Sequence, residues 1–191
     1  MGKVLESISG ELERWLTSQK LYFVATAPLS VEGHVNCSPK GGDTFRVLGE
    51  HEVAYLDLTG SGIETIAHLQ ENGRIVFVFC AFDGPPKIVR LHGTGSVVYP
   101  SDADFTPLAK QFPAHPGARA IIRVSITRVS ISCGFQVPLY EFVAERNALE
   151  NWTEKKSPEE LDAYRRQKNS ISIDEIPGYE PPRSPSAPRM Q

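Results

Sequence analysis

Residues 74–99, RIVFVFCAFDGPPKIVRLHGTGSVVY, predict two long strands joined by a tight turn. β-branched and aromatic residues dominate both halves, and the Asp83–Pro86 segment between them has the glycine and prolines typical of turns. Gly93 and Gly95 interrupt the second strand, where a missing side chain permits a bend or the close approach of another backbone. The stretch therefore indicates a strongly coiled antiparallel hairpin.

Further strands are predicted on both sides of this hairpin. They cover residues 21–27, the stretch GHVNCSPKGGDTFRV at 33–47, residues 52–58 and residues 120–132. In the last of these, apolar residues alternate at 122, 124 and 126 and then resume at 129 and 131. This change of phase at Thr127-Arg128 predicts a β-bulge.

Apolar residues at helical spacing predict helices within residues 4–18, 59–74, 105–112 and 146–168. In the second segment we expect Ser61 to cap the helix and Glu64 to complete a capping box. Asn72-Gly73 is expected to end that helix, and His68 to face solvent from it. Ser157-Pro158-Glu159-Glu160 predicts the start of the last helix.

About six strands with glycine bends, a few helices and no regular βαβ alternation indicate a mainly β chain with peripheral helices. An antiparallel barrel is therefore favoured over a doubly wound parallel sheet. We expect one domain over residues 1–178. Residues 179–191 are rich in proline and serine without apolar periodicity, and we expect them to form a flexible tail.

The composition of the 191 residues excludes several classes of function. A formal net charge of −3 provides no field for a polyanion, so we expect no nucleic-acid partner. The longest apolar run, residues 76–82, is far too short to cross a membrane, and the N-terminus lacks the apolar core of a signal peptide. We expect a soluble, cytoplasmic protein.

The three cysteines, Cys37, Cys80 and Cys133, form no CxxC pair and lie in strand-like runs. This predicts buried thiols rather than disulfides or a metal site. The five histidines show no metal-ligand spacing, and no nucleophile–base set is evident in the sequence order. The sequence therefore indicates no metal ion and assigns no catalytic residue.

Two features suit the binding of an anion. Lys40 lies between Pro39 and Gly41-Gly42, and the absence of side chains on the two glycines lets a ligand approach the backbone. Residues 59–62, Thr-Gly-Ser-Gly, precede a predicted helix, where free N–H groups and the helix dipole favour a phosphate. Each feature also has a purely structural interpretation, as a solvated turn lysine and as an ordinary helix start.

Five segments occur in an order and spacing that resemble the pyridoxamine 5'-phosphate oxidase-like family of FMN-binding split barrels. They are HVNCSPKGG (34–42), VAYLDLTGSGIETIAHLQENGRI (53–75), RLHGTGSVV (90–98), SCGFQVPLYEF (132–142) and YRRQKNSISIDEIPG (164–178). The resemblance covers residues 20–178. It implies a homodimer of six-stranded antiparallel split barrels, with FMN in a groove between the subunits.

The resemblance also implies which residues meet the cofactor. In the family, the strand that carries the Ser-Pro-Lys-Gly element lies along the flavin. Asn36, Ser38 and Lys40 would therefore face the flavin ring or the ribityl phosphate, and Gly41 would give clearance.

In the family, the helix after the following strand binds the phosphate, which implies contacts from Ser61, Gly62 and Thr65. Typical members place a basic residue near the start of this helix, whereas this chain has Ile63-Glu64-Thr65. We therefore expect a weaker grip on the phosphate, or one completed by Lys40, Arg46 or Arg90.

The resemblance implies an oxidoreductase in which the flavin exchanges hydride with an unidentified small substrate. Pyridoxamine 5'-phosphate oxidases hold their substrate with a basic C-terminal segment that contains histidine. Residues 170–191 contain no histidine, so we do not expect vitamin B6 oxidation. Two alternatives stay open: a non-catalytic flavin-binding module, and a split barrel that binds deazaflavin or haem.

The stretch from 135 to 152 carries more large apolar side chains than one small barrel is expected to enclose. They are Phe135, Val137, Leu139, Tyr140, Phe142 and Trp152. Since soluble monomers rarely expose a large apolar patch, we expect a homodimer that covers them and builds the flavin site. The alternative is that the C-terminal helices fold back over the same surface.

Overall fold

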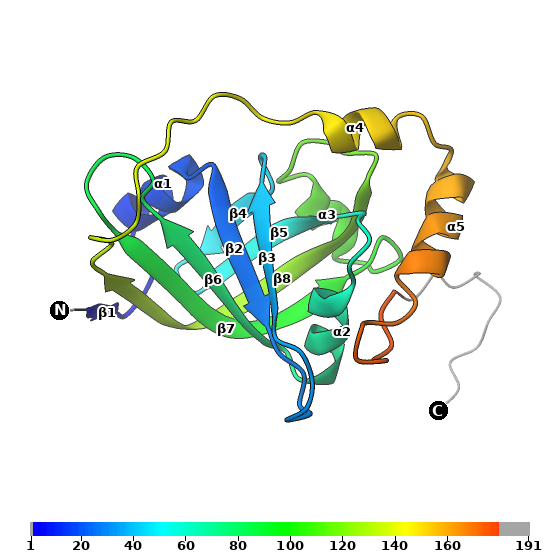
Figure 1. The fold of residues 1–191 in the computed structure, drawn as a ribbon, viewed down its shortest axis with the longest axis horizontal. Helices are drawn as coiled ribbons and strands as arrows, with labels where there is room; N and C mark the ends of the chain where they lie inside the picture. Colours follow the sequence, from blue (N-terminus) through cyan, green and yellow to red (C-terminus); the bar gives the residue numbers. More distant parts are fainter. Residues whose placement is uncertain (1, 180–191) are drawn as a thin grey trace.

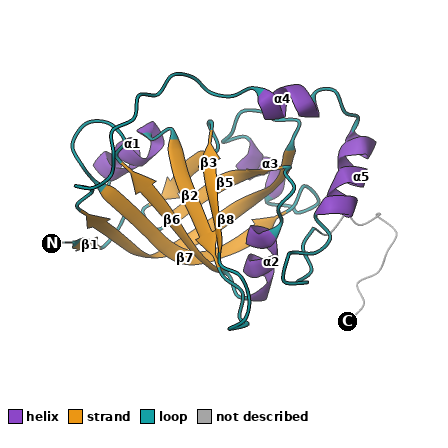
Figure 2. Ribbon diagram, viewed as in Figure 1, coloured by secondary structure: helices purple, strands orange, loops and turns teal. Residues whose placement is uncertain are grey.

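The computed structural model describes residues 2–179, which form one curled antiparallel sheet with helices around its rim (Figures 1 and 2). Seven strands follow one another in the order β3–β2–β6–β7–β8–β5–β4, and a short β1 pairs with β8. The strands are β1 (Lys3–Leu5), β2 (Leu21–Thr26), β3 (Asn36–Gly41), β4 (Phe45–Gly49), β5 (Glu52–Leu58), β6 (Arg74–Cys80), β7 (Ile88–Val98) and β8 (Ala118–Ser132). The helices are α1 (Gly10–Ser18), α2 (Glu64–Glu71), α3 (Phe105–Ala109), α4 (Ala148–Thr153) and α5 (Pro158–Lys168).

The predicted mainly β fold is confirmed, but the sheet within residues 2–179 has eight strands rather than about six, because residues 3–5 add a short strand and residues 33–47 do not form one strand. The chain turns at Gly42, which has a φ of +67°, and separates β3 from β4. These two strands are the opposite edges of the sheet, yet only residues 42–44 connect them. A connection this short forces the sheet to curl until its edges approach each other, which gives a barrel that stays open beside β3.

The bulge predicted at Thr127-Arg128 is confirmed. His92 of β7 pairs with Arg128 and Gly93 pairs with Ile126, so Thr127 is the extra residue. At Gly93 a Cβ atom would lie 2.2 Å from the carbonyl oxygen of Ser125, which explains the need for glycine there. The bulge increases the coiling of β7 and β8, the two longest strands.

An aromatic cluster fills the barrel. Its members lie on the inward face of four strands and are at most 6% exposed: Tyr22, Phe45, Tyr55, Phe77 and Phe79. The ring centroids of neighbouring members lie 5.0–6.4 Å apart, in tilted, edge and stacked contacts. Helix α1 adds Leu12 and Leu16 to this core, so it covers one end of the barrel.

Three of the predicted helices differ from their expected bounds. The helix expected within 4–18 begins only at Gly10, because residues 3–5 pair with β8. Ser61 does not cap α2: the helix begins at Glu64 with Ile63 as its N-cap. The segment 146–168 forms two helices, and the start predicted at Ser157–Glu160 is confirmed as a capping box of α5.

Two burial predictions are wrong. His68 is fully buried rather than solvent-facing, because α2 packs against the barrel and Thr26 of β2 hydrogen-bonds the His68 ring. Cys37 and Cys133 are exposed and Cys80 is partly exposed, since Cys37 lies on the outer face of an edge strand and Cys133 follows the end of β8.

No helix within residues 2–179 combines the length and the apolar character needed to cross a membrane. Across the same residues, no cluster of three or more histidine, cysteine or acidic side chains is arranged to hold a metal ion. The predicted tail lies outside the described residues, apart from its first residue, Tyr179.

Candidate functional site

Three of the predicted site residues share one face of β3. Asn36, Ser38 and Lys40 pair with Thr26, Val24 and Tyr22 of β2, which are all buried in the barrel. Directly opposite residues of an antiparallel pair point to the same side of the sheet. The three side chains of β3 therefore face inward at the edge where the barrel is open.

Lys40 crosses this opening from β3 to β5. Its Nζ lies 3.8 Å from Asp57 Oδ1 and 5.5 Å from the centroid of the Tyr55 ring. The Lys40 side chain is 25% exposed, whereas that of Asp57 is only 1% exposed. Lys40 is therefore a strand residue directed into this opening of the barrel, which we call the split. The alternative interpretation, a solvated turn lysine, is wrong.

Asp57 connects Lys40 to a second cation, Arg119 of β8. Arg119 Nε donates to Asp57 Oδ2 at 2.8 Å, and both side chains are almost fully buried. Burial alone lowers the pKa of Arg119, but the adjacent Asp57 carboxylate raises that pKa overall. Asp57 Oδ1, by contrast, has no hydrogen-bond partner among residues 2–179.

The loop that joins β5 to α2 is held by residues far away in the sequence. Arg119 Nη1 donates to the carbonyl oxygen of Gly62 at 3.1 Å. Asn169, which ends α5, donates from Nδ2 to the carbonyl oxygens of Gly60 at 2.9 Å and Ser61 at 3.3 Å. These contacts keep the chain at 60–62 out of α2, which explains why Ser61 does not cap that helix.

The peptide geometry of this loop fixes the direction of its N–H groups. In a planar trans peptide, the carbonyl and the following N–H point in opposite directions. Since the carbonyls of residues 60, 61 and 62 point to Asn169 and Arg119, the N–H groups of Ser61, Gly62 and Ile63 point away from them. Successive N–H groups on one side form a concavity that suits an anion.

A hydrogen-bonded chain links β3 to α2. Ser38 Oγ donates to Asn36 Oδ1 at 3.0 Å, and Asn36 Nδ2 donates to Thr65 Oγ1 at 2.9 Å and to Thr26 Oγ1 at 3.2 Å. Thr26 Oγ1 in turn lies 2.9 Å from Nδ1 of the buried His68. The structure thus brings Asn36, Ser38 and Thr65 together beside the split.

Other predicted residues lie apart from this group. Arg46 packs over the Phe112 ring, with its Cζ 5.1 Å from the ring centroid, and donates to the carbonyl oxygen of Gln111. Arg90 donates to Ser132 Oγ at 2.9 Å, on the outer face of the sheet. At Gly41 a Cβ would lie 3.3 Å from the backbone oxygen of Lys20, so the clearance there serves the chain's own backbone.

Sequence reasoning missed Asp57, Arg119, Arg165 and Asn169. Arg165 of α5 donates to Thr59 Oγ1 at 2.9 Å and so holds the start of the same loop. One signal was available for Asp57. It is two residues after Tyr55 and four after Val53, so its side chain points to the same inward side of β5, and an acid there needs a buried partner. The identity of that partner was not readable, because 62 residues separate it from Asp57.

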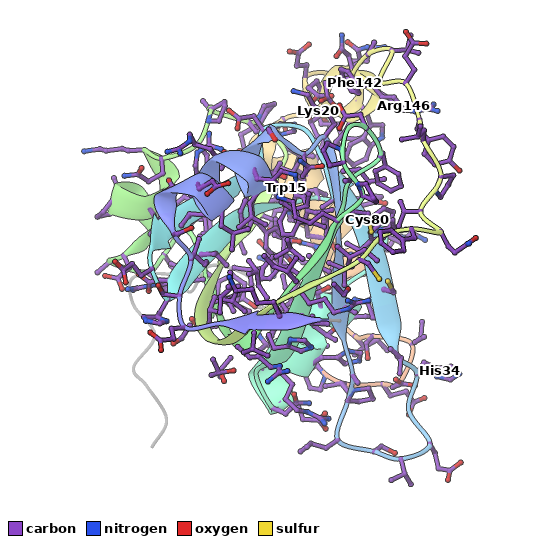
Figure 3. The ribbon with its side chains drawn as sticks, turned by 90° about the vertical axis from the view of Figure 1, so that its left-hand side faces the viewer. Trp15, Lys20, His34, Cys80, Phe142 and Arg146 are labelled. Atoms are coloured by element: carbon purple, nitrogen blue, oxygen red, sulfur yellow. The ribbon has the colours of Figure 1, made fainter. Side chains whose placement is uncertain are left out.

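The segment after β8 leaves the sheet as an extended arm, residues 133–147, which runs to α4 (Figures 1 and 3). Tyr140 N donates to the carbonyl oxygen of Phe82, and Lys20 lies over the Phe142 ring. Five large apolar side chains of the arm are at least 50% exposed: Phe135, Leu139, Tyr140, Phe142 and Val143. The arm and the ends of β6 and β7 also line an open, apolar groove of about 490 Å³.

Comparison with known proteins agrees with this architecture. Residues 8–133 match the family model described as pyridoxamine 5'-phosphate oxidase. The pyridoxamine 5'-phosphate oxidase family protein ustO of Aspergillus flavus is 42% identical over an alignment of 190 positions, which covers 91% of this chain and 76% of that protein.

Two solved structures show the same fold at low sequence identity. HupZ of Group A Streptococcus is 21% identical, with a TM-score of 0.50 over 64% of this chain and 91% of that one. A candidate pyridoxamine 5'-phosphate oxidase of Lactobacillus delbrueckii is 19% identical, with a TM-score of 0.51 over 66% of this chain and 98% of that one. The family match over residues 8–133 and the 42% identical relative establish that the chain belongs to the pyridoxamine 5'-phosphate oxidase family.

Proposed function

We propose that this protein is an oxidoreductase that binds FMN in the split between β3, β5 and α2. The observation that carries the proposal is the Lys40 ammonium, which lies within the split beside the buried Asp57 and remains partly exposed. The hydrogen-bonded side chains of β3 lie on the same inward face of the strand. An extended ligand with one anionic end fits this distribution of groups.

The residues of the split match the chemistry of FMN. Its ring and ribityl hydroxyls would meet Ser38 and Asn36, and its phosphate would meet the N–H groups of Ser61 and Gly62, with Lys40 as the adjacent cation. Bound FMN would supply the hydride chemistry, while this chain binds the flavin, orients it and limits its contact with water. Family membership supports the same cofactor class.

The cofactor is tested by titrating the purified protein, stripped of any bound flavin, with FMN. We expect saturable quenching or enhancement of flavin fluorescence and a shift of the two visible absorption bands. Deazaflavin and haemin are titrated in parallel. If FMN gives no saturable change while either of the other two does, the proposal is wrong and that ligand class replaces FMN.

We further propose that the protein is a homodimer in which the arm at 133–147 lies in the interface. Its exposed apolar side chains support this, because soluble monomers rarely leave such a patch uncovered. The outer face of β2 and β6 adds half-buried Phe23, Ala25, Val76 and Val78. A second copy would cover both surfaces through a two-fold axis.

Light scattering across a dilution series checks the dimer. The expected mass is about 42 kDa, twice the 21.1 kDa of one chain. Val143 is 90% exposed on the arm, and the substitution Val143→Asp should shift the measured mass towards the 21.1 kDa of a monomer. Val31→Asp is the matched control, since Val31 is 94% exposed on the β2–β3 loop. His34 of this loop lies at the opposite end of the molecule from Phe142 and Arg146 of the arm (Figure 3). A monomeric wild type, or equal effects of both substitutions, would contradict this interface.

A further inference from the structure

The start of α2 already holds an anion that belongs to the chain itself. Glu64, the first residue of the helix, turns back so that its Oε2 accepts a hydrogen bond from Ile63 N at 3.0 Å. The same oxygen lies against Gly62, where a Cβ atom would approach it to 2.8 Å. The Glu64 carboxylate therefore occupies the side of the 60–63 loop to which the N–H groups of this loop point.

Two of the neighbouring cations, Arg119 and Lys40, already have carboxylate or carbonyl partners of their own. Arg119 is committed to Asp57, to Asn169 and to the carbonyl oxygen of Gly62, and it is only 4% exposed. Lys40 lies 3.8 Å from the Asp57 carboxylate, which offsets much of its charge. A phosphate at the N–H groups of Ser61 and Gly62 would thus lie beside the Glu64 carboxylate, which already accepts from the next amide, Ile63 N.

We propose that Glu64 is a specificity-determining residue of the flavin site, whose carboxylate competes with the terminal phosphate of FMN for the amides before α2. This inference rests on the proposed function. It implies that the phosphate of FMN adds less affinity over riboflavin, which has no phosphate, than it would at a helix start without a nearby carboxylate. The ring and ribityl contacts along β3 then carry a larger share of the binding free energy.

The test compares the affinities of FMN and riboflavin for the wild type and two variants. Glu64→Gln removes the charge but keeps an oxygen that can accept from Ile63 N, whereas Glu64→Ala removes both. We expect Glu64→Ala to bind FMN about tenfold more tightly, because a charge-assisted contact to the phosphate replaces repulsion. Glu64→Gln should give a smaller gain, and riboflavin affinity should change less than about twofold in both variants.

Glu71→Gln is the matched control. Glu71 ends the same helix, about 10 Å from Glu64 along the axis, and its Oε2 accepts from Leu29 N at 2.7 Å. It loses the same charge and should leave the affinities of both flavins unchanged. Thermal melting of each variant shows whether the fold is retained.

The outcomes separate this inference from the function on which it rests. An equal gain for FMN and riboflavin, an equal gain from Glu71→Gln, or no gain from either Glu64 variant would overturn the role of Glu64 and leave the flavin site standing. A wild type that binds neither flavin would overturn the proposed function, and the role of Glu64 with it.

Discussion

Replacing Arg119 with alanine is expected to lower the free energy of unfolding by about 3–5 kcal/mol, because it leaves a buried carboxylate without its partner. Asp57 is 1% exposed and would keep only the ammonium of Lys40 at 3.8 Å. The loop before α2 would also lose the hydrogen bond from Arg119 to the carbonyl oxygen of Gly62. Urea unfolding, followed by tryptophan fluorescence, measures the loss.

Arg123→Ala is the control for this prediction. Arg123 is the other arginine of β8 that forms an ion pair, with Nε 2.6 Å from Glu52 Oε1, but its side chain is 40% exposed. Because water and salt screen such a pair, we expect a loss of only about 0–1 kcal/mol. Similar losses for the two variants would show that burial does not set the contribution of the Asp57–Arg119 pair.

Replacing Lys40 with alanine is expected to weaken FMN binding by about tenfold to a hundredfold, because one charge-assisted contact to the phosphate is lost. Riboflavin, which has no phosphate, should be affected less. Fluorescence titration with both flavins gives the two dissociation constants. Lys87→Ala is the control, since the Lys87 ammonium packs 4.1 Å from the centroid of the Trp15 ring, outside the proposed site.

The pattern of losses locates Lys40 relative to the cofactor. An equal loss for FMN and riboflavin would place its ammonium at the flavin ring, beside Tyr55, rather than at the phosphate. Unchanged affinity for both would restrict Lys40 to holding Asp57 across the split. In that case the amides at 61–63 would carry the anion without it.

Several elements were predictable because their signals are local. Runs of apolar, β-branched and aromatic residues marked β2, β5, β6, β7 and β8, and the change of phase at Thr127-Arg128 located the bulge. Ser157 and Glu160 form the capping box that their spacing indicates, and Gly73, with a φ of +72°, follows the end of α2. Each of these features depends on residues within one or two turns of the chain, so the sequence alone carries it.

Through its resemblance to the family, the sequence implied that Asn36, Ser38 and Lys40 face the same ligand, and the structure places the three on one face of β3. The sequence did not reveal which residues of other elements these three side chains contact. Ser61 and Glu64 have the spacing of a capping box, yet the hydrogen bonds from Arg119 and Asn169 hold the loop at 60–62 outside the helix.

By itself, then, the sequence determined most of the strands, the bulge and most helix ends, since these follow from local backbone geometry. Only the tertiary structure decided that Lys40, Asp57 and Arg119 form one cluster and that Asn169 fixes a loop 109 residues earlier. The physical reason is that buried charges and carbonyls take whichever partner the folded chain brings within hydrogen-bond reach. No local pattern encodes that choice.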